Sequence, residues 1–307
     1  MIDFAPSILH ELPLVLREYL DANQVCDKHR QHIELHVRRF DEWMHRRETS
    51  RLESDSALIS AWLAQLAAQP NLGPTTVNAH RGTVLSLVRF ATSDGDPLPR
   101  ADRIRRQKTP QKVNVAFTQD EIRAMLAAAP RYQPMTERTY GRGIAGDVIP
   151  RHRPDGVRWS VWWEAFVRVG YESGQYLSDL RLIPWRHVGA DGAITFTRHK
   201  TGKLMSFRLS PKALWAAKKI GHETLLLPWD FEMGSYFPRE FKKFCRFARV
   251  RELTPKSLRR SAITYTYMES GEEAARVLAG HSSFATTARH YIDYSIARRP
   301  IVSPPPL

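Results

Sequence analysis

The chain has 307 residues, with 46 Lys and Arg against 32 Asp and Glu, so its formal charge is +14 and its pI is close to 10.0. This charge favours a nucleic-acid partner and, with 42% hydrophobic residues, the length predicts about two domains. No apolar run reaches the roughly 18 residues of a membrane span, no signal peptide is recognisable, and two cysteines exclude a disulfide framework and a four-cysteine zinc site. We therefore expect a cytoplasmic chain, nucleoid-associated if bacterial, with no membrane partner.

Residues 1–95 have the spacing of helices and almost no strand signal. Apolar residues recur at helical intervals from Ile33 to Met44 and again from Leu58 to Leu66. A third helix is predicted after the start signal Gly73-Pro74-Thr75-Thr76. The pattern predicts a small all-helical N-terminal domain.

The polar faces of these helices are cationic. Arg38, Arg39 and Arg81 are candidates for contacts with DNA phosphates, although a solvated helix face explains such charges equally well. Cys26 and three histidines also lie within one predicted helix. Four ligands from one helix rarely close a tetrahedron, so we expect no metal site.

Residues 96–116 predict a basic linker between the two domains. Helix-breaking residues precede a run of positive charges that includes Arg105 and Arg106, a composition that favours an extended segment along a phosphate backbone over a packed element. Thr118 and Glu121 then have the spacing of a capping box. A second domain is predicted over residues 117–298, followed by a Pro-rich tail at 299–307.

The second domain is predicted to be mixed α+β. We expect a long loop at 131–157, a buried helix at Val161–Tyr171, and further helices near 211–220 and 235–249. Alternation over Ala193–His199 and Met205–Leu209 predicts a β-hairpin whose turn contains Lys200, Gly202 and Lys203. The predicted fold class is mainly α with a small antiparallel β-sheet.

The last fifty residues contain the parts of a metal-free strand-cutting centre. Arg259 offers a planar fork of donors to phosphate oxygens, His281 can hold or pass a proton, and the Tyr291 hydroxyl can become attached to phosphorus. Each alone has an ordinary structural explanation, as a surface charge, a core histidine or a packing tyrosine. Tyr294, three residues later, is a second candidate nucleophile. The joint order of the three residue types favours the catalytic interpretation.

Arg259, His281 and Tyr291 lie in three short motifs, which make the pattern more specific than the three residues alone. They are Pro255-Lys-Ser-Leu-Arg259-Arg, Leu278-Ala-Gly-His281-Ser-Ser and Thr286-Thr-Ala-Arg-His-Tyr291. With them, the chain resembles the tyrosine recombinases, also called phage-type integrases, over nearly its whole length. The resemblance implies an N-terminal core-binding domain that clamps DNA and a mixed α+β catalytic domain.

The resemblance also implies a role for each matched residue. Tyr291 would attack a DNA phosphate to give a 3′-phosphotyrosyl link, Arg259 would stabilise the charge on the nonbridging oxygens, and His281 would hydrogen-bond the phosphate or assist proton transfer. Lys200 matches the family's hairpin lysine, which protonates the leaving 5′-oxygen, and Lys203 is its rival. Because the covalent link retains the bond energy, no cofactor, metal or ATP is needed.

Two positions depart from the family pattern. Lys256 stands where the family usually has His, but the related type IB topoisomerases have Lys there, so we keep Lys256 in the catalytic set. Tyr176 stands where the family has its first catalytic arginine. A tyrosine offers no charged, bidentate donor, and loss of one such donor commonly costs about 10²- to 10³-fold in rate. Neither Arg168 nor Arg181 is expected to replace it.

The leading hypothesis is a site-specific recombinase that acts on double-stranded DNA as a homo-oligomer on paired sites. The alternative is a recombinase-derived DNA-binding protein with weak or no cleavage, acting in regulation or architecture, and Tyr176 favours it. A topoisomerase-like enzyme is a third possibility. If Tyr176 has impaired the centre, Tyr176→Arg should raise the yield of covalent adduct.

Overall fold

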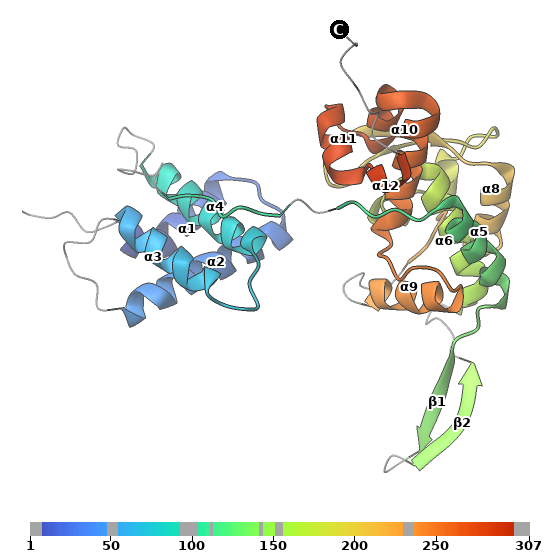
Figure 1. The fold of residues 1–307 in the computed structure, drawn as a ribbon, viewed down its shortest axis with the longest axis horizontal. Coiled ribbons are helices and arrows are strands. Elements are labelled where there is room, and N and C mark those ends of the chain that lie inside the picture. The colour runs from blue at the N-terminus through green and yellow to red at the C-terminus, as the bar shows by residue number, and fades with distance from the viewer. Residues whose placement is uncertain are drawn as a thin grey trace, which may run out of the picture. The chain divides into compact units, whose positions relative to one another are not determined.

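A computed structural model describes residues 8–47, 55–92, 104–110, 113–140, 144–150, 156–229 and 236–297. The chain divides into two compact units, Met1–Gln111 and Lys112–Leu307, which are described separately (Figure 1). The predicted Pro-rich tail at 299–307 lies outside the described residues. The predicted fold class, mainly α with little antiparallel β structure, is confirmed.

The N-terminal unit is a helical bundle. Its elements are η1 (Ile8–His10), α1 (Leu12–Ala22), α2 (Asp27–Arg46), α3 (Asp55–Ala67) and α4 (Pro74–Ala91). Phe40, Trp62 and Val84 are almost completely buried in its core. The three predicted helices are present, but α1 was not predicted. Its apolar side is short and contains a proline in the first turn, where proline is tolerated, so the sequence signal is weak.

The predicted linker is held at both ends: Ala116 is buried in the second unit, where its N–H donates to Asp293 Oδ2 at 2.8 Å, and residues 104–110 are held by the N-terminal unit. Residues 104–110 form neither helix nor strand, as expected, but Ile104 is buried and its carbonyl accepts a hydrogen bond from Arg81 Nε at 2.7 Å. Asn78 and Gln107 exchange two further hydrogen bonds, each of 2.9 Å. The prediction of a segment without packing is therefore wrong for residues 104–110, because Ile104 joins the apolar core of the N-terminal unit and α4 supplies the polar partners.

The second unit is built mainly from helices. They are α5 (Gln119–Ala128), η3 (Ala129–Arg131), α6 (Trp159–Ser173), α7 (Leu177–Leu180), η5 (Trp185–His187), α8 (Pro211–Lys218), α9 (Tyr236–Phe247), α10 (Lys256–Ala279), α11 (Phe284–Tyr291) and α12 (Tyr294–Ala297). Thr118 and Glu121 form the predicted capping box at the start of α5. The central helix α6 is buried, and its Trp163 stacks on Phe244 of α9 with ring centroids 5.1 Å apart. This aromatic core fixes the helices that carry the site.

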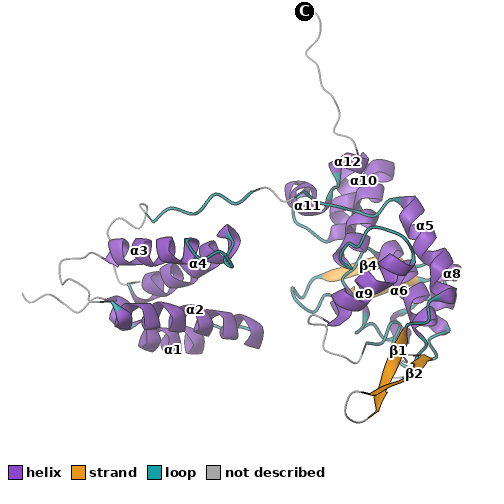
Figure 2. Cartoon of the chain, turned by 60° about the horizontal axis from the view of Figure 1, so that its bottom comes forward, coloured by secondary structure: helices purple, strands orange, loops and turns teal. Residues whose placement is uncertain are grey.

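The second unit also has two antiparallel hairpins. Strands β3 (Ala193–Thr197) and β4 (Leu204–Arg208) form the predicted one, and Gly202 in its turn has a φ of 64°. Strands β1 (Met135–Tyr140) and β2 (Ile144–Pro150) form the other, which extends away from the helices (Figures 1 and 2). The predicted loop over this stretch is thus wrong. Gly, Pro and Arg dominate the local composition, whereas a hairpin is held by backbone pairing that composition does not reveal.

None of the helices in the described ranges is both long enough and apolar enough to serve as a transmembrane segment.

Candidate functional site

Arg259 lies at the centre of the predicted site. It projects from the first turns of α10 and is only 2% exposed. Its guanidinium donates from Nη1 to the Gly174 carbonyl and from Nη2 to the Ala279 carbonyl at 2.7 Å. Gly174 has a φ of 60° and ends α6, while Ala279 ends α10. Arg259 therefore ties together the two loops that carry the other site residues.

The structure brings Tyr291 and His281 to this arginine. Tyr291 is the last residue of α11, is 4% exposed, and has its ring centroid 4.9 Å from Arg259 Cζ. His281 follows Gly280, and its ring centroid is 5.2 Å from that of Tyr291. His281 Nδ1 hydrogen-bonds the Thr287 hydroxyl at 3.0 Å, which fixes the orientation of the ring. Residues from two helices and a loop thus converge on one spot.

Tyr176 lies beside Tyr291, the predicted nucleophile. It immediately precedes α7, and its ring centroid lies 4.3 Å from Arg259 Cζ. Its hydroxyl hydrogen-bonds the Tyr291 hydroxyl. The position at which the family pattern places a cation is therefore filled by an aromatic ring that contacts both Arg259 and Tyr291.

The two hydroxyls differ in acidity. Burial raises the pKa of Tyr176 to about 12, although the Arg259 charge acts against it. Burial also opposes ionisation of Tyr291, but Arg259, the Tyr176 hydroxyl and Lys256 outweigh it and lower the pKa of Tyr291. Tyr291 is consequently the group that ionises first, and once it has done so Tyr176 is the donor in their hydrogen bond.

His281 is neutral at pH 7. Burial, followed by the charges of Arg259 and Arg198, lowers its pKa to about 4. A neutral imidazole can accept a proton or a hydrogen bond, whereas the cation could only donate. The surroundings of His281 therefore keep its ring uncharged and able to accept a hydrogen bond, while they disfavour its protonated form.

The candidate lysines lie at different places around the site. Lys256 Nζ is 5.0 Å from the Tyr291 ring centroid. Lys203 is exposed, and its Nζ donates to the Gly280 carbonyl at 3.1 Å, next to His281. Lys200 is also exposed, in the turn between β3 and β4. Of the two hairpin lysines, Lys203 is the one that contacts the His281 loop.

Arg198 was missed by the sequence interpretation, yet it lies in this site. It directly follows β3, is 6% exposed, and has its Cζ 5.9 Å from the Tyr176 ring centroid. The signal was present in the strand pattern: Ile194 and Phe196 point inward, and alternation puts Arg198 on the same buried face. A charged residue at an inward-facing position should have been noticed.

The two other arginines considered as replacements lie elsewhere. Arg168 Nε pairs with Glu164 Oε1 at 3.3 Å within α6. Arg181 Nη1 donates to the Trp229 carbonyl at 3.4 Å. The expectation that neither replaces the arginine absent at position 176 agrees with these contacts.

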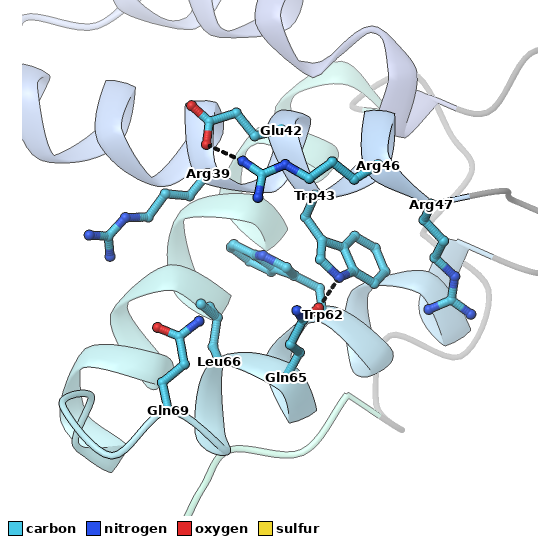
Figure 3. Close-up of a pocket in the computed structure, with 9 residues that line it drawn as sticks. All are labelled: Arg39, Glu42, Trp43, Arg46, Arg47, Trp62, Gln65, Leu66 and Gln69. Carbon is cyan, nitrogen blue, oxygen red and sulfur yellow. Dashed lines mark hydrogen bonds and ion pairs between the residues drawn. The ribbon is translucent and has the colours of Figure 1, made fainter.

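The N-terminal unit has its own basic pocket of about 590 Å³, shown in Figure 3. Arg39, Arg46 and Arg47 line it together with Trp43, and Arg47 Cζ is 5.1 Å from the Trp43 ring centroid. Trp43 Nε1 in turn donates to Gln65. Three guanidiniums at the rim of a pocket with an aromatic wall suit contacts with a nucleic-acid backbone.

The other predicted DNA-contact residues of this unit have different surroundings. Arg38, Arg105 and Arg106 are exposed, so their charges face solvent. Arg81 is partly buried and bonded to Ile104, which gives it a structural role. Throughout the described ranges, no group of His, Cys, Asp and Glu side chains has the arrangement of a metal site.

Known structures resemble this one in fold. No family model matches the sequence, and no curated protein matches it either. A lambda integrase dimer bound to a COC′ core site superposes with a TM-score of 0.68 at 15% identity, over 96% of this chain and 80% of the other.

Two further structures superpose over most of their length. XerH site-specific recombinase bound to a palindromic difH substrate gives a TM-score of 0.62 at 13% identity, over 94% of this chain and 82% of the other. The Tn1549 transposon integrase in complex with transposon right end DNA gives 0.61 at 12% identity, over 91% and 94%. The chain therefore has the tyrosine recombinase fold.

Proposed function

We propose that the protein is a site-specific DNA recombinase or integrase that cuts and rejoins DNA through a 3′-phosphotyrosyl intermediate. One observation carries the proposal: Tyr291, Arg259 and His281 converge, with the Tyr291 ring 4.9 Å from Arg259 Cζ and 5.2 Å from the His281 ring. The similarity in fold to recombinases in complex with DNA supports it.

In the proposed reaction, the Tyr291 oxygen attacks the scissile phosphorus and the bond from phosphorus to the 5′-oxygen breaks. The phenolic proton passes to water, with neutral His281 as a hydrogen-bond acceptor beside it, and Arg259 donates to the nonbridging oxygens as their charge grows. A lysine protonates the leaving 5′-oxygen. The contact of Lys203 with the Gly280 carbonyl favours Lys203 over Lys200 for that step.

Rejoining is the reverse reaction. A 5′-hydroxyl from a second strand attacks the phosphotyrosyl phosphorus and releases Tyr291. Exchange between strands requires more than one protomer, and lambda integrase forms a dimer on a core site and a tetramer on a Holliday junction. We infer a similar homo-oligomer on paired sites for this chain.

The N-terminal unit is proposed to hold the duplex. The pocket residues Arg39, Arg46 and Arg47, together with exposed Arg38, Arg105 and Arg106, would contact phosphates. Such contacts release counterions, so DNA affinity should fall steeply as salt rises.

A DNA-binding protein with little or no cleavage is the second candidate. The hydrogen bond between the Tyr176 and Tyr291 hydroxyls favours it, since this bond engages the hydroxyl of the proposed nucleophile. Binding and cleavage must therefore be measured separately.

The test begins with DNA that the protein itself selects from random duplexes. A nicked suicide substrate is built on the selected site, and covalent adducts are resolved by denaturing electrophoresis. Tyr291→Phe is compared with the matched control Tyr294→Phe, the other candidate nucleophile.

We expect adduct with the parent chain and with Tyr294→Phe, and none with Tyr291→Phe. An adduct that persists in Tyr291→Phe and disappears in Tyr294→Phe would reassign the nucleophile. If a tightly bound site gives no adduct with the parent chain, the recombinase proposal fails and the non-cleaving candidate replaces it.

A further inference from the structure

Arg198 and Arg259 form a buried pair of guanidiniums. Arg198 Nη2 donates to Gln175 Oε1 at 2.7 Å, and Arg259 Nη1 reaches the same oxygen at 3.4 Å. Both arginines also donate to the Ala279 carbonyl, Arg198 at 3.4 Å and Arg259 at 2.7 Å. Because the two arginines share two acceptors, their charged ends lie side by side, although Arg198 follows β3 and Arg259 belongs to α10.

The conformation of the loop at Gly280 and His281 depends on the close contact with Arg198. Gly280 has a φ of 71°, and a Cβ at this position would lie 2.9 Å from Arg198 Nη1 and 2.7 Å from Met205 Sδ. A glycine is therefore needed for the His281 loop to pack against Arg198. The contact joins the hairpin to the rest of the site.

The pair has too little negative charge around it. The Asp179 carboxylate lies 3.6 Å from Arg198 Nε, while the hydrogen-bond acceptors of Arg259 are neutral. Within the described ranges, no carboxylate forms an ion pair with Arg259, and neither Nε has a hydrogen-bond acceptor. Two buried cations with one counter-charge are costly unless an anion joins them.

We propose that Arg198 is the second cation of the phosphate-binding centre and replaces, from the end of β3, the arginine that is absent at position 176. The proposal rests on the proposed function, in which a DNA phosphate enters this centre. Arg198 and Arg259 then bind the nonbridging oxygens of one phosphate, as paired planar guanidiniums do. The charge that Tyr176 lacks is supplied by another element.

A purely structural role is the competing explanation, because Arg198 is close to Asp179. The two roles differ in their response to the charge of the substrate. A methylphosphonate at the cleavage position replaces one nonbridging oxygen by a neutral methyl group. An arginine that neutralises phosphate charge becomes less important on this substrate, whereas an arginine that only maintains the fold matters equally on both.

The experiment compares cleavage of phosphodiester and methylphosphonate suicide substrates by the parent chain, Arg198→Met and Arg168→Met. Arg168 is the matched control, a partly buried arginine paired with Glu164 outside the site. We expect Arg198→Met to lose about 10²- to 10³-fold in rate on the phosphodiester and less than about tenfold on the methylphosphonate. Equal losses on both substrates would overturn the proposal.

A second measurement does not require cleavage. Inorganic vanadate, a phosphate mimic, is titrated into the parent chain while the arginine Nε–H signals are followed by NMR; substitutions to Lys assign the Arg198 and Arg259 signals. The expected result is that both signals shift with the same midpoint. A shift of Arg259 alone, or of neither, contradicts the proposal, whereas failure of the parent chain to cleave bound DNA contradicts only the proposed function.

Discussion

The substitution Tyr176→Arg distinguishes two hypotheses. In one, the phosphate-binding centre lacks a second cation; in the other, Arg198 supplies that cation. A guanidinium at the place of the Tyr176 ring would lie about 4.3 Å from Arg259 and 5.9 Å from Arg198. At an effective dielectric constant of about 20, these distances correspond to repulsions of roughly 4 and roughly 3 kcal/mol. Since Tyr176 is partly exposed, the new side chain can turn towards solvent, and we expect a net loss of about 2–4 kcal/mol in the free energy of unfolding.

Thermal unfolding and adduct yield measure the outcome. A loss of this size should lower the Tm by on the order of 10 °C, and the adduct yield should not rise. The double variant Tyr176→Arg with Arg198→Met removes the repulsion and should form at least about tenfold more adduct than Arg198→Met alone. Tyr176→Met controls for loss of the ring. The reasoning is refuted if Tyr176→Arg alone is as stable as the parent chain and forms more adduct.

Three further predictions concern ionisation and proton transfer. Tyr176→Phe removes the donor that lowers the pKa of Tyr291, so the pH profile of adduct formation should move to higher pH, and an unchanged profile would contradict the role of that hydrogen bond. Lys203→Ala should slow cleavage more than Lys200→Ala, and a 5′-sulfur leaving group, which needs no protonation, should restore the rate only for the lysine that acts as the acid. Burial, with the neighbouring charges, lowers the pKa of His80 to about 4. The unfolded chain, with a histidine pKa near 6.5, therefore takes up protons first, so the stability contribution of His80 is intact above about pH 6.5 and declines towards pH 4. Urea unfolding should reveal about 1.6 kcal/mol less stability at pH 5 than at pH 6.5 from this residue, and His80→Gln should weaken that dependence; an equally steep dependence in the variant would assign it to other groups.

The fold was predictable wherever periodicity is strong. Helices α2 and α4 and the β3–β4 hairpin follow apolar spacing and turn residues that are visible in the sequence. Helix α1 and the β1–β2 hairpin were missed because a short apolar side and backbone pairing leave little trace in composition. Local sequence pattern therefore predicted the long helices and one hairpin, whereas the elements that depend on tertiary contacts or backbone pairing were missed.

The candidate site, too, was predicted only in part from the sequence. The spacing of Arg259, His281 and Tyr291 identified residues that the fold then brings together. Arg198 lies 61 positions before Arg259 in the sequence, and only packing of the hairpin against the α10 terminus makes the two neighbours. Comparison with the family motif shows that position 176 is a tyrosine. It does not show that Arg198, which follows β3, lies beside the same site.

In the proposed reaction, Tyr176 has two opposite effects on the rate of cleavage. Because Tyr176 is uncharged, it offers the phosphate no cationic donor, and this slows the reaction. Its hydroxyl, with a pKa of about 12, remains protonated and donates to Tyr291, whose own pKa is lowered, so it favours formation of the attacking phenolate. If Arg198 supplies the missing phosphate contact, the first effect becomes small and the second remains. Tyr176→Phe should then slow cleavage at neutral pH, whereas in a centre disabled by Tyr176 its removal would leave the low rate unchanged or raise it.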